Sequence, residues 1–418
     1  MRKINFKLSF SIMLILSGLF FLTSCNKSLE QLAPIATPVY PAGNGIAATL
    51  AANPAYSNYT ALIARAGLTA SLNDLTKTFT LIATDNNGMN LFANAASGGL
   101  VPYPAPDAVV LGFINGSLPV ASAAGIVQYN TIGQKFTFAS FGTSFPNYPI
   151  TSQIILDPTQ PFVRMSIFPR GGTPYSYVNN LPVIAPDMAA ANGVIHTTYS
   201  IVAPPSATLK TMLDNDASLT YFKVAIARAD SGIAAGTSQF GFLLNYGVTN
   251  MTVLAPNDAA FQTLVFGLVY SQVFNATGNA ALATATANGA VAAGPNFLQT
   301  NNVSTALVRG IVAYHLLASL TSSTTTPYQP NIRVFSNNVP STPGFFIKTL
   351  VNGSIAVHPG VMAQATYTGP AVASLKFSSY GTFPPGGAPF SYIANTVTMD
   401  KHAVNGVYHI IDKVLLPQ

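Results

Sequence analysis

Cysteine is almost absent from this chain of 418 residues, because Cys25 is the only one. A chain with a single cysteine forms no internal disulfide, so its folded state depends on buried apolar area instead of covalent cross-links. A lone cysteine also excludes zinc sites that are built from cysteine pairs.

Charged residues are scarce as well, at 7% of the chain against about 25% in an average globular protein. The acidic residues are eleven Asp and a single Glu, and that Glu30 lies near the N-terminus. Asn, Thr, Ser and Gln must therefore supply the polar surface, a composition that suits contact with neutral polymers. Few carboxylates remain for paired acid–base catalysis. Asp214 and Asp216 are close in sequence, and we interpret them as a solvated helix start.

The common catalytic motifs are missing too. None of the five histidines lies in a His-Glu-x-x-His motif, and the chain has neither a Gly-x-Ser-x-Gly elbow nor a phosphate-binding loop. Residues 43–48 imitate a dinucleotide fingerprint, but they follow a proline-rich segment instead of a strand. The sequence therefore predicts a protein that is not an enzyme and that holds neither a cofactor nor a metal.

The N-terminus carries a signal for export. Three basic residues precede an apolar run over residues 8–21, which is shorter than the roughly 20 residues that a membrane-spanning helix needs. The following Leu-Thr-Ser-Cys sequence resembles the bacterial lipobox, which predicts a lipoprotein signal peptide over residues 1–24 and lipidation of Cys25. Several acyl chains would anchor the mature chain durably. The alternative is an ordinary cleaved signal with a chance cysteine.

Removal of that signal leaves 394 residues, and it takes away three of the 18 basic residues, so the mature net charge is +3. Basic residues do not cluster, and we expect no nucleic-acid partner. Residues 25–45 contain three prolines among small residues and read as a lipidated tether. Asn26 and Lys27 show no familiar acidic retention signal, which favours the outer membrane, with surface exposure left open.

Beyond the tether, the sequence repeats itself in order. The matched segments are 63–66 with 226–229, 80–83 with 252–255, 125–130 with 310–315, 171–177 with 386–392, and 192–196 with 405–409. Because the second copy is longer, it carries insertions between shared elements. The sequence thus predicts two homologous domains, 46–205 and 206–418, that meet near Pro204 and Pro205.

Each copy mixes helix and strand signals. Tyr56, Tyr59, Ile63 and Ala66 recur at helical spacing, as do Leu219, Phe222, Ile226 and Ala229 in the second copy. Residues 251–255 read as a buried strand before Pro256, after which Asn257 or Asp258 caps a helix. Residues 407–411 and 414–416 read as strands. These signals predict an α+β fold.

The second copy has a long low-charge insertion near residues 266–305. No charged residue occurs between Asp258 and Arg309, and residues 275–302 are rich in Ala, Thr, Asn and Gly. We interpret this insertion as a surface loop or partly disordered flap, because it offers few large side chains to bury. A binding role is the alternative, since long loops often carry function.

Three segments of the second copy resemble the hallmarks of fasciclin-type domains. Residues 252–261 (TVLAPNDAAF) resemble the first hallmark, residues 405–417 (NGVYHIIDKVLLP) the closing one, and Tyr314-His315 the central tyrosine–histidine pair. The first copy diverges: Thr84 replaces the hallmark proline, Asn130 replaces the histidine, and the closing Asp-Lys is gone. The resemblance implies two tandem fasciclin-like domains, each a wedge of two β-sheets flanked by helices.

That resemblance also implies a role in adhesion or matrix association, usually without catalysis. It makes Tyr314 and His315 candidate partner-binding residues, although so apolar a segment favours burial with internal hydrogen bonds. His409 reads as structural, because it alternates with strand residues. A metal site formed by His315 and His409 lacks an evident carboxylate or thiolate partner.

The predicted function is therefore that of an envelope-anchored, non-enzymatic adhesion or interaction lipoprotein that binds an extracellular protein, matrix or polysaccharide. The alternative is an accessory glycan-binding lipoprotein of a nutrient-uptake complex, in which Tyr148, Tyr175 or Phe390 would stack on sugars. A third reading, a structural spacer, predicts no ligand.

Overall fold

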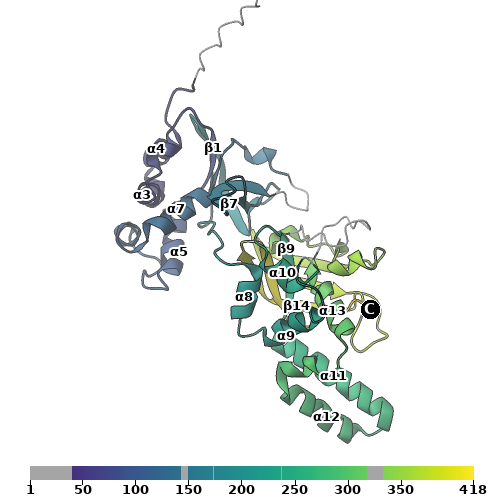
Figure 1. Ribbon diagram of the computed structural model, residues 1–418. Helices are drawn as coiled ribbons and strands as arrows, with labels where there is room; N and C mark the ends of the chain where they lie inside the picture. Colours follow the sequence, from purple (N-terminus) through teal and green to yellow (C-terminus); the bar gives the residue numbers. More distant parts are fainter. Residues whose placement is uncertain (1–39, 143–148, 173, 237, 318–332) are drawn as a thin grey trace, which may run out of the picture. The chain divides into compact units, whose positions relative to one another are not determined.

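A computed structural model describes residues 40–142, 149–172, 174–236, 238–317 and 333–418 (Figure 1). The predicted signal peptide, Cys25 and most of the tether lie outside these residues, as does Tyr148. Residues 42–418 form one compact unit. No single helix of the described residues is long and apolar enough to span a membrane, although the bent pair Asp107–Ser117 and Val120–Tyr129 passes the same test by length and composition.

The elements of the first half follow one another in chain order as α2 (Ile46–Ala51), η1 (Pro54–Tyr56), α3 (Ser57–Arg65), α4 (Thr69–Leu72), β1 (Phe79–Thr84), α5 (Asn86–Ala96), α6 (Asp107–Gly112), η2 (Phe113–Ser117), α7 (Val120–Tyr129), β2 (Thr131–Ile132), η3 (Phe138–Ser140), β3 (Ile150–Ile155), β4 (Arg164–Ile167), β5 (Pro169–Arg170), β6 (Tyr177–Val178), β7 (Leu181–Ala190) and β8 (Gly193–Thr198). Their strands are hydrogen-bonded in the order β4-β3-β2-β1-β8-β7-β6-β5. The last strand, β8, runs parallel to β1.

The elements of the second half are α8 (Leu209–Asn215), α9 (Thr220–Ala229), α10 (Phe240–Asn245), β9 (Met251–Pro256), α11 (Asp258–Thr277), α12 (Ala280–Ala292), η4 (Gly294–Gln299), α13 (Thr305–His315), β10 (Leu316–Leu317), η5 (Ser336–Asn338), β11 (Phe345–Ile347), η6 (Leu350–Gly353), β12 (Val361–Thr368), β13 (Ala371–Ser379), β14 (Tyr392–Ala403) and β15 (Gly406–Ile411). The strand order is β10-β9-β15-β14-β13-β12-β11. Here β15 runs parallel to β9, as β8 does to β1.

One long strand joins two sheet portions in this second half. The first residues of β14 pair with β13, whereas the residues from Thr396 onward pair with β15. In the first half, β7 likewise pairs with β6 at its start and with β8 over the remainder. Each half is thus an α+β arrangement in which two sheet portions share a strand, as the predicted wedge requires.

The predicted amphipathic stripes lie where the sequence places them. In α3, Tyr59, Leu62 and Ile63 are buried, and in α9 the buried residues include Phe222 and Ile226. The strand β9 is buried along its whole length, and the Asn257 side chain caps the following helix by accepting a hydrogen bond from the Ala260 backbone N–H. These apolar faces pack against the sheets and form the core of each half.

The second-copy insertion is helical, so the predicted loop is wrong. Residues 266–305 contain most of α11, all of α12 and η4. Alanine has the highest helix propensity, which an interpretation based on missing bulky residues overlooks. Gly278, at φ 66°, ends α11, and the Asn279 side chain caps α12 through the Leu282 N–H. Ala283, Ala287 and Ala290 form the buried face of α12, and their small size lets it lie close to α11.

Residues 414–416 are not a strand, which corrects a second prediction. They follow a bend at Asp412 and Lys413 and have no ladder partner. Val414 and Leu415 are nevertheless buried, and the Leu415 N–H donates to the His315 ring instead of to a strand. Their apolar character reflects burial alone.

Candidate functional site

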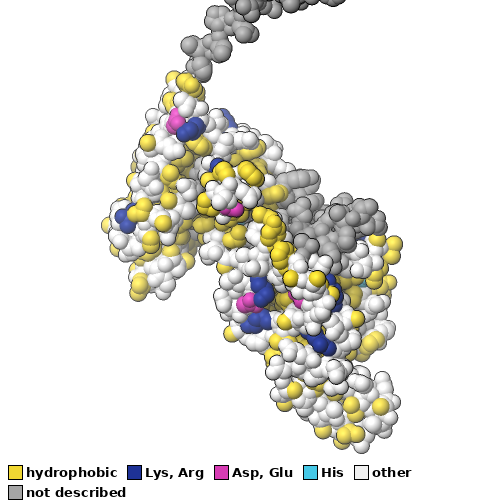
Figure 2. All heavy atoms as spheres, in the orientation of Figure 1, with side chains coloured by type: hydrophobic (Ala, Val, Ile, Leu, Met, Phe, Trp, Pro, Cys, Tyr) yellow, Lys and Arg dark blue, Asp and Glu magenta, His cyan; other side chains and the backbone are white. Residues whose placement is uncertain are grey.

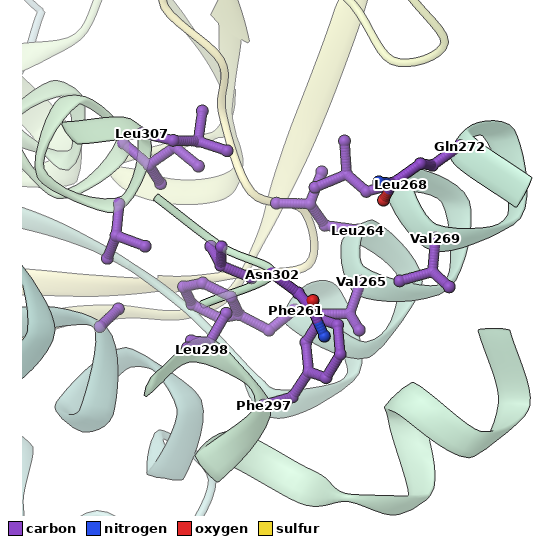
Figure 3. Close-up of a pocket in the computed structure, with 14 residues that line it drawn as sticks. Phe261, Leu264, Val265, Leu268, Val269, Gln272, Phe297, Leu298, Asn302 and Leu307 are labelled. Atoms are coloured by element: carbon purple, nitrogen blue, oxygen red, sulfur yellow. The ribbon is translucent and has the colours of Figure 1, made fainter. Parts of the chain in front are cut away.

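The second half contains an apolar cavity of about 290 Å³ at the base of the α11–α12 hairpin. Side chains of α11 from Phe261 to Gln272 form one wall, and side chains from residues 297–311 face them across the space (Figure 3). The lining residues are Ala225, Phe261, Leu264, Val265, Leu268, Val269, Gln272, Phe297, Leu298, Asn302, Val303, Leu307, Val308 and Ile311. Gln272 and Asn302 are the polar side chains among them.

A second cavity, of about 530 Å³, continues along the hairpin between α11 and α12. It shares four lining residues with the first, namely Val269, Gln272, Phe297 and Asn302. On the α12 side its wall is made by Thr286, Gly289, Ala290 and Ala293, whose small side chains leave the space open. We refer to the two connected cavities together as the hairpin groove.

The chain around the hairpin groove carries no charge. Residues 259–308 contain no Asp, Glu, Lys or Arg, and in Figure 2 the hairpin, which lies at the bottom of the view, shows only hydrophobic and uncharged polar atoms. Several large apolar side chains are exposed here, including Leu268 at 39%, Leu307 at 45% and, on α12, Leu282 at 47%. The exposed surface of the hairpin is therefore uncharged and partly apolar.

The outer side of α11 bears three stacked aromatic rings, the aromatic ladder. Phe266, Tyr270 and Phe274 are spaced four residues apart, and their ring centroids lie 6.0 and 5.7 Å apart with nearly parallel planes. With 3.6 residues per turn, this row lies on the opposite side of the helix from Phe261 and Leu264, which line the groove. Phe274 is 40% exposed.

Tyr314 and His315 lie inside the second half instead of at its surface. Both side chains are fully buried. The Tyr314 hydroxyl donates to the Gly360 carbonyl at 2.7 Å and accepts from the Tyr380 N–H at 3.0 Å. Contact of either side chain with a partner would require this segment to open.

The His315 ring bridges two chain segments. Its Nδ1–H donates to the Ile311 carbonyl at 2.8 Å, and its Nε2 accepts from the Leu415 N–H at 3.0 Å. Both bonds need the neutral ring, and burial lowers the pKa of His315 to about 4. In the first half, Asn130 occupies the same place and donates to the Ile126 and Val202 carbonyls.

The closing motif has the same structural role in both halves. Asn192 accepts from the Ile46 N–H, the first of α2, and donates to the Leu72 and Asp74 carbonyls. Asn405 accepts from the Leu209 N–H, the first of α8, and donates to the Leu244 and Tyr246 carbonyls. Each asparagine therefore ties the last strand of its half to the first helix and to the segment before the first strand.

Two aspartates that the sequence analysis missed belong to this repeated motif. Asp187 and Asp400 have positive φ values of 61° and 58° at the bulges in β7 and β14. The N–H of each donates to the histidine of the same motif, His196 or His409. The shared Asp-x4-Asn-Gly-Val-x-His pattern was the available signal. His409 is fully buried, in agreement with its structural interpretation.

The described residues hold no group of three His, Cys, Asp or Glu side chains that could bind a metal ion. Asp214 and Asp216 lie at the end of α8, not at a helix start, where Asp214 pairs with Lys210 at 2.5 Å. Of the aromatic residues considered for sugar stacking, Tyr175 is 39% exposed and Phe390 contacts Phe346 and Tyr380.

The chain was compared with known families, curated proteins and solved structures. No protein-family model matches the chain, and neither does any curated protein. A search of solved structures returns a FAS1 domain pair from the insect cell adhesion molecule fasciclin I, at 16% sequence identity and a TM-score of 0.30. The match covers 87% of this chain and 98% of that one.

Proposed function

We propose that this protein is a non-enzymatic adhesion or interaction lipoprotein, held in the cell envelope by lipid on Cys25 and exposed on the outer membrane. The observation that carries the proposal is the projecting α11–α12 hairpin, which exposes aromatic and aliphatic side chains and carries no charge after Asp258. Exposed contiguous apolar surface on a folded protein marks an interaction site. Its partner is an extracellular protein, matrix or polysaccharide.

The aromatic ladder supplies the contact chemistry. Rigid aromatic side chains offer large contact area with little loss of conformational freedom, and they dominate binding energy at many interfaces. The three stacked rings form an uncharged, largely apolar row along one helix side, which suits an uncharged polymer or a neutral protein face. A highly charged partner would lose hydration here without gaining an ion pair.

Removal of the ladder should weaken adhesion strongly. We expect a variant with Phe266→Ser, Tyr270→Ser and Phe274→Ser to lower attachment at least about tenfold, as for the loss of an interface hot spot. Beads coated with residues 26–418 are allowed to attach to matrix recovered from the producing cells and are counted after shear. The matched control is Phe242→Ser with Tyr246→Ser, which removes another stacked and exposed aromatic pair. Equal loss in both variants, or no attachment by the unaltered protein, would contradict the proposal.

A second candidate, glycan binding, is favoured by a separate aromatic cluster. Phe346 and Tyr380 are 42% and 40% exposed, and both contact the Phe390 ring, at 5.1 and 5.7 Å between centroids. Phe390 has a φ of 64°, which is rare for a bulky residue and sets the direction of its ring. Aromatic faces of this kind stack on sugar rings.

On this second candidate, Phe346→Ala should weaken saturable binding of a neutral oligosaccharide by at least about tenfold, as for other interface hot spots. Titration of a panel of oligosaccharides against residues 26–418 by calorimetry measures the effect. Phe162→Ala serves as the control, because Phe162 is 75% exposed and lies outside the cluster. A panel without a saturable ligand rejects the glycan role.

A further inference from the structure

We propose that the hairpin groove binds one long, uncharged hydrocarbon chain, such as the acyl chain of a neutral lipid. This binding site is distinct from the aromatic ladder and goes beyond the adhesion role. It rests on the shape of the groove, the chemistry of its lining and the lack of charge around it.

The shape of the groove favours a long and slender ligand. Its two cavities, of about 290 and 530 Å³, share Val269, Gln272, Phe297 and Asn302, so they follow one another along α11. The lining on α11 runs from residue 261 to residue 277, which at 1.5 Å per residue spans about 24 Å. One leaflet of a bilayer core is roughly 15 Å thick, so a lipid chain fits within this length.

The lining favours hydrocarbon over a polar ligand. In the deeper cavity, twelve of the fourteen lining side chains are apolar, and Leu298, Val308 and Ile311 belong to the buried core. Leu268 and Leu307 are 39% and 45% exposed, so a hydrocarbon chain that covers them removes apolar surface from water, which favours binding. A sugar or a nucleotide would leave its hydroxyl or phosphate groups without partners on such walls.

The polar groups of the groove favour an uncharged head. Gln272 and Asn302 lie where the two cavities meet, and both are exposed. Their amides can donate and accept hydrogen bonds with a hydroxyl or an ester. A carboxylate head would meet no lysine or arginine among the lining residues of either cavity.

The second cavity is open because the residues on its α12 side are small. On the α12 side, Gly289, Ala290 and Ala293 face the second cavity, where larger residues would fill it. A hairpin that served only as a packed strut would be expected to close this gap, because interiors are normally close-packed. The small residues on the α12 side therefore leave an open groove beside α11.

Binding of 1,6-diphenylhexatriene, a rod-shaped uncharged probe that fluoresces in apolar surroundings, tests the proposal on residues 26–418. We expect a saturable rise in fluorescence that both hexadecanol and monoolein reverse. The compound that displaces half of the probe at the lower concentration shows whether a free alcohol or a glycerolipid is the preferred source of the chain. Displacement by palmitate at pH 8 should require an at least tenfold higher concentration, because its head is charged. No saturable signal, or displacement by palmitate as easily as by hexadecanol, would overturn the inference.

Two lining variants locate the site. Leu268→Gln and Leu307→Gln should each weaken probe binding at least tenfold, whereas Leu282→Gln should leave it unchanged, because Leu282 is similarly exposed but does not line either cavity. Circular dichroism and urea midpoints confirm that all three variants fold. The triple ladder variant should keep full probe binding, which separates this site from the adhesion surface. Equal binding by Leu268→Gln and Leu282→Gln would refute the assignment.

Discussion

Replacing Asn405 with alanine should destabilise the protein by about 3 kcal/mol or more, because several buried backbone groups lose their partners together. The side chain is fully buried. Alanine would leave the Leu209 N–H and the Leu244 and Tyr246 carbonyls without the bonds of 2.8, 2.9 and 3.1 Å that Asn405 makes. Urea unfolding followed by circular dichroism measures the loss.

Two further substitutions test whether the loss of stability comes from these buried hydrogen bonds. Asn192→Ala should cost a similar amount, because Asn192 makes the equivalent bonds in the first half. Asn395→Ala removes a single exposed bond to Asp412, at 2.9 Å, and should change stability by less than about 0.5 kcal/mol. If Asn405→Ala proves as mild as Asn395→Ala, the closing asparagine does not hold its half together.

Acidification is the second condition with a large expected effect, because the surroundings of four histidines favour the neutral ring. Burial lowers the pKa values of His196, His315, His402 and His409. The unfolded chain takes up protons near pH 6.5, whereas folded His315 does so only near pH 4. The stabilisation is therefore complete above pH 6.5 and is lost as the pH falls toward 4, with about 3 kcal/mol from His315 alone.

The surroundings of the other histidines differ in charge. Asp187 and Asp400 lie 3.8 and 4.0 Å from His196 and His409 and oppose the lowering of their pKa values. His402 instead accepts a hydrogen bond from buried Arg333 at 2.7 Å, and this neighbouring cation adds to the effect of burial on its pKa. A proton on His402 would remove that bond and place two cations together.

The internal repeat provides the control for this pH effect. His315→Asn imitates the first half, where Asn130 holds the same place, so the variant should fold at pH 7.5. Between pH 7.5 and 4.5 its unfolding free energy should fall by at least about 2 kcal/mol less than that of the unaltered protein. Identical pH profiles for the two proteins would show that His315 does not titrate in this range.

Much of the framework follows from local sequence. The helical spacing of Tyr59 and Ile63 and the apolar run before Pro256 predict α3 and β9, because one periodicity or one buried run suffices to define each element. The internal repeat predicts that the two halves share their construction, and the equivalent bonds of Asn192 and Asn405 agree with it.

The hairpin and its groove could not be predicted in the same way. An alanine-rich segment without large residues reads as a loop until its caps, Gly278 and Asn279, are recognised. The groove depends on the placement of α12 against α11, which brings together residues that share no local pattern. For Tyr314 and His315 the sequence suggested a binding role, because they match a family motif. In the structure their hydrogen bonds are all internal.

The parallel pairing of the final strands has a consequence for the order of folding. β8 can pair with β1 only after residue 198 has been made, and β15 can pair with β9 only after residue 411 has been made. Contacts between such distant segments form late, because the intervening chain must first be confined. The second half therefore stays open until β15 has been made, and in a chain that crosses a membrane as an extended polymer this half stays unclosed until β15 has crossed. A nascent chain that ends before β15 would expose the edge of β9, which makes early termination a direct route to aggregation.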